Sequence, residues 1–268
     1  MTSLLLKTTC IATLAFGTTQ AFAQTYPEMI NVVGDTFKMG FDINQAQTDD
    51  KAVHKVIVGN YKIAKTEVTV KQWKHYCEVT ANPMPAEMPN YGWVDENPMV
   101  NISWEDAVGY CEWLSAEKGR KFRLPTEAEW EFAARGGAAT KGYPYSGGKG
   151  SDMVGWTSDN SGSRPHAVAT KRANELGLYD MSGNVYEWCA DRYGNFGTRT
   201  LVNPKGPSNG SMRVYRGGSW YTPGNYCDVY VRESNNPKEH FSFVGFRPVE
   251  ESNADDAQLP VYAAQPNR

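Results

Sequence analysis

Three stretches of the chain place a hydroxyl residue directly before a run of helix-forming residues, and each predicts the start of an α-helix. They begin at Thr69, Ser103 and Thr126, and each has a polar or acidic residue three positions later. Such pairs satisfy amide groups of the first turn that have no helical acceptor. Gly119 and Gly136-Gly137 are expected to end the second and third helices. The second helix also repeats apolar residues along one face: Ala107, Val108, Cys111 and Leu114.

Residues that favour β-strands occur before and after these helices. Val32–Phe37 holds a Gly-Asp pair between such residues, which predicts a strand, a turn and a strand. Val53–Ile63 alternates as one or two further strands. After Gly136 the chain is rich in Gly, Ser, Asn, Asp, Pro and Tyr, with short β-prone pieces at Arg213–Trp220 and Val229–Arg232. Helices followed by a loop-rich β half predict an α+β fold, with no linker and no internal repeat.

Composition and charge narrow the class of protein. The chain has 268 residues, of which 40% are hydrophobic and 12% aromatic, enough for one large packed domain. The formal net charge is -3, and acidic and basic residues are interleaved without a basic stripe. Nothing therefore indicates binding to nucleic acid or to an anionic membrane surface.

The N-terminus has the three parts of a secretory signal. Lys7 is the sole charged residue before an apolar stretch from Cys10 to Phe16, and Ala21-Phe22-Ala23 forms a small-residue cleavage site before Gln24. A membrane anchor or a buried N-terminal strand is the alternative, but the apolar run is too short to span a bilayer. Residues 1–23 are thus predicted to be a signal peptide. The mature protein would be periplasmic or secreted, with no membrane insertion.

The remaining chain is expected to form a single domain over residues 24–249. A polar stretch within it, from Asp42 to Asp50, favours a surface loop. The last residues, 250–268, are polar and contain two prolines, so they are expected to form a flexible tail.

Seven sequence blocks in fixed order resemble the formylglycine-generating enzyme (sulfatase-modifying factor) family, which also includes ergothioneine sulfoxide synthases and pyoverdine-maturation factors. The blocks are Gly34–Gly40, Ala64–Trp73, Pro98–Ala107, Arg123–Gly137, Gly177–Trp188, Arg216–Trp220 and Gly245–Arg247. The resemblance covers roughly Met29 to Val249. It implies a C-type-lectin-like α+β fold with little regular secondary structure, held together by loops and bound cations.

The block from Asp180 to Trp188 has the residue types of a calcium site. Two carboxylates seven residues apart flank a glycine-containing turn, and Ca²⁺ prefers carboxylate and carbonyl oxygens. The resemblance implies a structural calcium bound by the side chains of Asp180 and Glu187 and by the carbonyls of Gly183 and Val185. The alternative is a solvated acidic turn with Trp188 packed inward.

The family's copper chemistry is implied to be incomplete here. In the family, two cysteines five residues apart bind one copper ion, and O₂ then oxidises a substrate cysteine. The matching positions are Thr222 and Cys227, and threonine is a poor ligand for Cu(I). Ser219 matches an active-site serine of the family. Cys227 and Ser219 are therefore the catalytic candidates, although the known copper mechanism is expected to fail.

Iron chemistry has no better support. The sulfoxide synthases bind iron through clustered histidines on a separate domain, whereas the four histidines of this chain are scattered. We expect all four to be surface or hydrogen-bonded core residues: His54, His75, His166 and His240.

Four cysteines remain after signal cleavage: Cys77, Cys111, Cys189 and Cys227. An oxidising compartment permits two disulfides, and sequence alone leaves all three pairings open. Cys227 is either a residual thiol or single metal ligand, or half of a disulfide, for which Cys189 is the expected partner. The disulfide is the favoured interpretation.

The resemblance leaves three functions. The first is an exported, atypical enzyme (an oxidoreductase if active) or maturation factor that acts on a peptide or peptide-derived metabolite without the two-cysteine copper site. The second is a non-catalytic C-type-lectin-like binding module, for which the loop from Tyr221 to Tyr226 offers adaptable Tyr and Asn contacts. The third is an authentic formylglycine-generating oxidase, which Thr222 argues against. In each case the partner is a peptide or protein.

Overall fold

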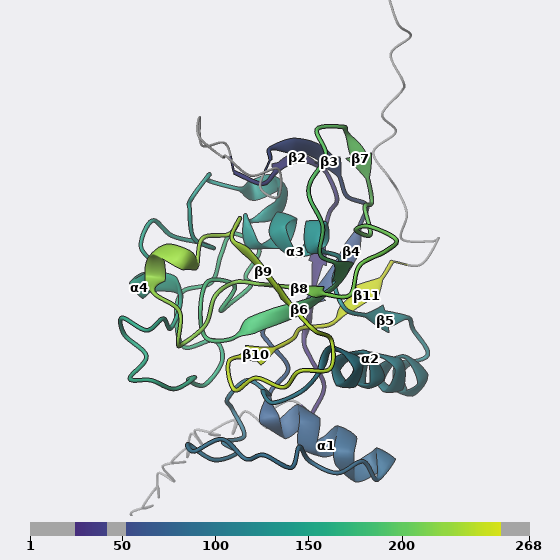
Figure 1. The fold of residues 1–268 in the computed structure, drawn as a ribbon, viewed down its shortest axis with the longest axis vertical. Coiled ribbons are helices and arrows are strands. Elements are labelled where there is room, and N and C mark those ends of the chain that lie inside the picture. Colours follow the sequence, from purple (N-terminus) through teal and green to yellow (C-terminus); the bar gives the residue numbers. More distant parts are fainter. Residues whose placement is uncertain (1–24, 42–51, 253–268) are drawn as a thin grey trace, which may run out of the picture.

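The structure, a computed structural model, describes residues 25–41 and 52–252 (Figure 1). The predicted signal peptide at 1–23, the predicted surface loop from Asp42 to Asp50 and the chain after residue 252 lie outside the described residues. Within them, no helix is both long and apolar enough to cross a bilayer.

The helices begin where the hydroxyl residues predict. In all three capping positions the side chain accepts from the amide three residues on, and that residue's side chain accepts in return. Gly119, with φ 62°, ends the second helix, and Gly136, with φ 91°, follows the third. A one-turn helix follows later in the chain. The helices are α1 (Val70–Thr80), α2 (Trp104–Lys118), α3 (Glu127–Ala134) and α4 (Ser151–Val154).

The described strands form three small sheets. The first is antiparallel, in the order β1 (Met29–Val32), β4 (Tyr61–Ala64), β11 (Val249–Glu251) and β5 (Phe122–Arg123). The second has the order β10 (Val244–Gly245), β6 (Tyr186–Arg192), β8 (Arg213–Arg216) and β9 (Arg232–Asn235). The third has the order β2 (Thr36–Met39), β3 (His54–Ile57) and β7 (Leu201–Val202). With four helices joined by long loops, this confirms the α+β class.

The first two strands do not pair with each other, although Val32–Phe37 predicts strand, turn and strand. Instead β1 pairs with β4 and β2 pairs with β3, so the turn carries the chain from one sheet to another. Gly34 permits this crossing, because a Cβ there would lie 2.2 Å from the carbonyl oxygen of Val58. The last β-prone piece also shifts: β9 begins at Arg232 rather than at Val229.

The ordered domain extends past the boundary expected at residue 249. Glu250 and Glu251 belong to β11, which completes the first sheet. Glu250 is buried and pairs with Lys62 and Arg120, each at 2.9 Å. These ion pairs and the strand hydrogen bonds hold two residues that polarity alone assigns to a tail.

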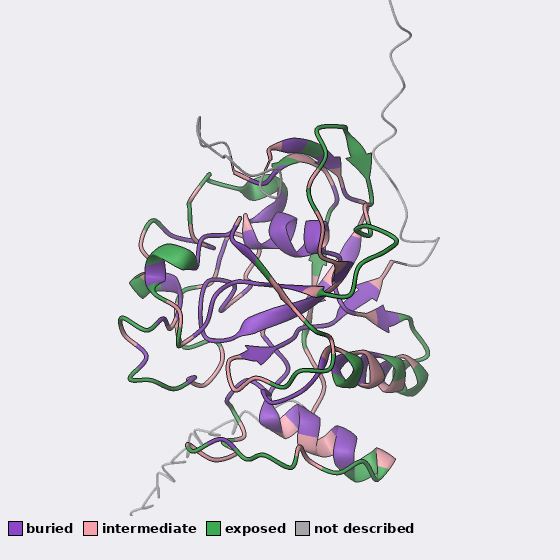
Figure 2. Cartoon of the chain, viewed as in Figure 1, coloured by how far each residue is buried: buried purple, intermediate pink, exposed green. Residues whose placement is uncertain are grey.

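The apolar core has two parts, and Figure 2 colours the buried residues of both purple. One lies under α1 and α2, where Trp73 stacks on Tyr110 with ring centres 5.6 Å apart. The other surrounds α3, which has only one partly exposed residue, Glu129. Two buried glutamates on α3 are neutralised by arginines from the second sheet: Glu127 by Arg232, and Glu131 by Arg216. The loops that carry the candidate residues therefore extend from a core whose buried glutamates are paired with arginines.

Candidate functional site

The loop that carries the catalytic candidates follows β8. Gly218 has φ 78°, and a Cβ at this position would lie 2.3 Å from the sulfur of Cys227. Only glycine therefore lets the thiol lie this close to the backbone. A short 3₁₀ turn at Gly224–Tyr226 returns the chain so that Cys227 faces Gly218.

The structure brings Ser219, Thr222 and Cys227 together. Ser219 Oγ and Thr222 Oγ1 are 2.9 Å apart, and the Tyr186 hydroxyl also hydrogen-bonds Thr222. The Cys227 thiol lies 3.7 Å from the carbonyl oxygen of Pro223 and 4.0 Å from that of Thr222. The site is thus a chain of three hydroxyls beside one thiol.

Cys227 is not poised as a metal ligand or nucleophile. Its side chain is fully buried, and burial raises the pKa of the thiol to about 12. The thiolate is the form that attacks and that binds Cu(I), so the neutral thiol is a weak ligand. Because Thr222 offers no second sulfur, these residues do not fit the two-cysteine copper site.

The expected disulfide between Cys189 and Cys227 is wrong. All four cysteines of the described residues are free and buried. Cys189 lies on β6, within the core around α3, and its sulfur is directed to the carbonyl of Glu187. Cys227 instead faces Gly218, in a loop outside both core clusters. The two sulfurs therefore lie in different surroundings.

The four groups expected to bind calcium are not equally available. Glu187 has no exposed area, and Arg247 donates to both of its oxygens, at 2.6 and 2.7 Å. The indole N–H of Trp130 donates to one of them as well, at 2.7 Å. Glu187 therefore already has a positive partner in this arrangement. The main-chain groups at Gly183 and Val185 lie in the turn between it and Asp180.

Asp180 has fewer hydrogen-bond partners than Glu187. Its Oδ2 accepts from the amide of Ala169, while its Oδ1 is buried without a hydrogen-bond partner among the described residues. Burial raises the pKa of Asp180 to about 6. Glu67, which sequence analysis missed, is also fully buried and has one unpartnered oxygen; its other oxygen accepts from Asn184. Burial, followed by the charge of Asp180, raises the pKa of Glu67 well above its usual range.

The signal for these missed residues was present but incomplete. Glu67 and Arg247 both belong to blocks that carry the family resemblance. Membership of these blocks indicates that the two residues matter to the family, but it does not say what they contact. Only the fold places them beside the turn that contains Asn184 and Glu187, 60 or more residues away. With all three carboxylates ionised, Glu67, Asp180, Glu187 and Arg247 would carry two net negative charges in the interior.

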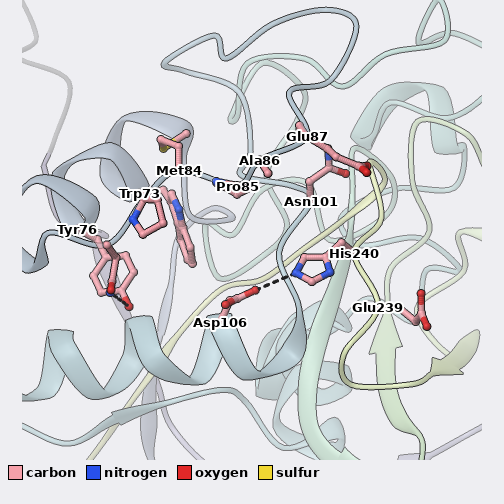
Figure 3. Close-up of a pocket in the computed structure, with 12 residues that line it drawn as sticks. Trp73, Tyr76, Met84, Pro85, Ala86, Glu87, Asn101, Asp106, Glu239 and His240 are labelled. Carbon is pink, nitrogen blue, oxygen red and sulfur yellow. Dashed lines mark hydrogen bonds and ion pairs between the residues drawn. The ribbon is translucent and has the colours of Figure 1, made fainter.

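A separate cleft of about 730 Å³ opens between α1, α2 and the segment 239–240 (Figure 3). Trp73 and Tyr76 contribute aromatic surface from α1, and Asp106 projects from the start of α2. His240 lies 3.3 Å from Asp106, so a histidine that sequence analysis set aside lines the cleft. The buried indole N–H of Trp73 has no acceptor among the described residues. Two further carboxylates lie on the wall: Glu87 and Glu239.

A row of aromatic side chains continues from this cleft toward the Ser219 loop. Phe241 stacks on Phe243 at 5.1 Å, and Phe243 stacks on Tyr221 at 6.2 Å. Tyr221 is 68% exposed. The carbonyl of Ser242 accepts from the indole N–H of Trp220 at 3.1 Å, which fixes the row against the loop. The segment 239–243 therefore forms a wall of the cleft and part of the aromatic row.

Comparison with protein families agrees with this fold. The model of the sulfatase-modifying factor enzyme 1-like domain matches residues 15–252, most of the chain. Among solved structures, Treponema denticola variable protein 1 has a TM-score of 0.73 and is 28% identical, covering 84% of this chain and 95% of that one. The predicted C-type-lectin-like architecture is thereby confirmed.

Two curated relatives have different names. The formylglycine-generating enzyme of Streptomyces coelicolor is 36% identical over 181 residues, 61% of this chain and 54% of the relative. The serine/threonine-protein kinase pkn1 of Chlamydia pneumoniae is 32% identical over 245 residues, 82% of this chain and 37% of the relative. The chain thus spans about half or less of the length of these relatives.

Proposed function

Because the chain belongs to the sulfatase-modifying factor family, we propose that it is an exported member that binds a peptide or peptide-derived metabolite in the cleft of Figure 3. The bound molecule extends along the aromatic row to the loop of Ser219 and Cys227. One observation carries this proposal: the segment 239–243 joins cleft and loop, with His240 in one and Phe243 beside the other. The protein acts there as an atypical enzyme or a maturation factor.

The chemistry of the cleft suits a polypeptide. Trp73, Tyr76 and Met84 give the cleft apolar surface on which peptide side chains can pack. Glu87, Asp106 and Glu239 favour a peptide with basic side chains. The exposed ring of Tyr221 and the partly buried rings of Phe241 and Phe243 add large, rigid contact area at low entropic cost.

The loop chemistry differs from thiol-copper oxidation. Ser219, Thr222 and Tyr186 form a hydroxyl chain that can orient a substrate carbonyl or carry a proton, while Cys227 stays neutral. The burial of this thiol also favours the second candidate function, a non-catalytic binding module. Both candidates share peptide binding and differ only in whether the bound molecule is changed.

Selection of random peptides displayed on phage tests the shared step. Peptides rich in Lys or Arg are expected to be enriched, and Glu239→Lys and Tyr221→Ser should each weaken their binding at least tenfold. Glu105→Lys is the matched control, because Glu105 is exposed on α2 but does not line the cleft. Absence of enrichment, or equal binding by all variants, would contradict the proposal.

Mass spectrometry of a selected peptide after incubation with the protein and O₂ separates the two candidates. A change in peptide mass that Ser219→Ala abolishes would identify an enzyme. An unchanged peptide that remains bound would identify a binding module or a maturation factor that acts without chemistry.

Export and calcium belong to the same proposal. Export rests on the sequence pattern that ends at Ala23, and an intact mass that begins at Gln24 tests it. Calcium rests on the unpartnered oxygens of Asp180 and Glu67 and on the negative charge that these carboxyl groups would carry when ionised. Asp180 would hold the ion with the carbonyls of Gly183 and Val185, and the ion would balance that charge.

A further inference from the structure

A second cavity, of about 330 Å³, is lined by residues of β3, α3 and β6 and by the chain that follows β6. Its walls are largely apolar, with Met39, Phe196, Leu201 and Pro207 among them. Four buried polar side chains also line it: His54, Glu127, Asp191 and Arg232. A mostly apolar space with a few convergent polar groups is typical of a small-molecule site.

Asp191, at the end of β6, presents a free oxygen at this cavity. The residue is 3% exposed, and its Oδ2 accepts from the amide of Glu127 at 2.9 Å. Its Oδ1 accepts from no described residue. Because Asp191 lines the cavity, this oxygen can accept a hydrogen bond from a molecule bound there.

His54 offers a second acceptor. Its Nδ1 lies 3.0 Å from the carbonyl oxygen of Ala52, and a carbonyl can only accept, so Nδ1 carries the hydrogen. The Nε2 of the neutral ring is then a bare acceptor, and no described residue donates to it. The ring packs against Phe196 with centres 4.7 Å apart, which holds it at the cavity wall.

The donors at the cavity are already used. Arg232 donates to both oxygens of Glu127, at 2.7 and 2.5 Å, and to the carbonyl of Gly194 at 2.8 Å. Glu127 has a second cation nearby, because Arg216 lies 3.6 Å from it, whereas no described cation forms an ion pair with Asp191. Asp191 is therefore a carboxylate in the cavity wall without a positive partner.

We propose that this cavity binds a small organic ammonium ion, whose apolar body fills the space and whose N–H groups donate to Asp191 Oδ1 and His54 Nε2. Arg192 and Lys205 at the rim oppose a cation, but both reach solvent, where water and salt screen them. Charge-assisted hydrogen bonds in a buried space supply the affinity.

Binding should release a proton. Burial raises the pKa of Asp191 to about 8, and the nearby charge of Glu127 raises it as well. The empty protein therefore holds a proton on Asp191 at pH 7. An ammonium ion favours the carboxylate, so that proton leaves to solvent when the N–H to Oδ1 contact forms.

Calorimetric titration with 2-phenylethylammonium chloride, and with uncharged 2-phenylethanol, tests the proposal on the full protein. The ammonium is expected to bind at least tenfold more tightly than the alcohol at pH 7. Titrations in phosphate and in Tris buffer should differ in heat by about one released proton. Equal affinities, no binding at millimolar ligand or no proton release would each overturn the proposal.

Asp191→Asn keeps the shape but not the charge, and should weaken ammonium binding at least tenfold and abolish proton release. Asp152→Asn, in exposed α4, is the matched control and should change neither. Unchanged binding by Asp191→Asn would overturn the proposal. If that variant does not fold, the wild-type titrations with the two ligands and in the two buffers still test the proposal.

Discussion

Arg247 donates to both carboxylate oxygens of Glu187, with Nε 2.6 Å from Oε2 and a terminal nitrogen 2.7 Å from Oε1. Neither side chain is exposed. Glu187→Ala leaves the guanidinium buried without its partner and is expected to lower the free energy of unfolding by about 3–5 kcal/mol. Urea unfolding followed by tryptophan fluorescence measures this change.

An exposed ion pair is the control for that prediction. Lys74 and Asp95 lie 2.6 Å apart, but both are more than a third exposed. Lys74→Ala should cost less than about 1 kcal/mol, because water screens the pair. A similar cost for both substitutions would show that the Glu187–Arg247 contact is not specially important.

Chelation tests the calcium proposal. If Ca²⁺ binds at Asp180, a chelator should lower the melting temperature of the wild type by about 5 °C or more. Asp180→Asn should remove most of that response. Glu187→Ala should retain it, because Arg247 already occupies the Glu187 oxygens. Identical wild-type melting with and without chelator would remove calcium from this turn.

The free cysteines predict a simple labelling pattern. In protein cut before Gln24, an uncharged maleimide at pH 8 should label no cysteine in the native state, because all four are buried. Denaturation without reductant should then expose four thiols. If fewer than four thiols are labelled and the others appear only after reduction, the protein contains a disulfide.

The single thiol at the loop predicts the absence of copper-dependent oxidation. With Cu(I) and O₂, the wild type should not convert a cysteine peptide to formylglycine, because Thr222 cannot replace a thiolate. Thr222→Cys should bind one Cu(I) ion in competition with a chelator, whereas the Thr222→Ser control should not. Aldehyde formation by the wild type would refute this interpretation of the loop.

Asp191 predicts a pH dependence of stability. Its pKa is about 8 in the folded state and close to 4 in an unfolded chain. Between these values the folded state holds a proton that the unfolded state has lost, so this group lowers the free energy of unfolding as pH rises. The slope is about 1.4 kcal/mol per pH unit from pH 5 to 7 and vanishes above 8.

Urea unfolding of the wild type and of Asp191→Asn across this pH range isolates the contribution of Asp191 to the free energy of unfolding. The asparagine variant should lack the decrease, since it does not titrate. Parallel pH profiles for the two proteins would mean that Asp191 is ionised in the folded state.

Local features of this protein were predictable from its sequence. A capping box needs only two residues three positions apart, as in Ser103 and Asp106, so it can be found without knowing the rest of the fold. The left-handed backbone at Gly119 is equally local. The ordered blocks from Gly34 to Arg247 also identified the family and its α+β fold.

Only the tertiary structure decided which distant groups meet. It placed Arg247 on Glu187, which changes the availability of a predicted calcium ligand, and it directed Cys189 and Cys227 into different surroundings. It also brought His240 and Trp73 to one cleft, and Asp191 and His54 to one cavity. The interaction energy of a side chain depends on what surrounds it after burial. A single sequence records spacing along the chain and not those neighbours in space.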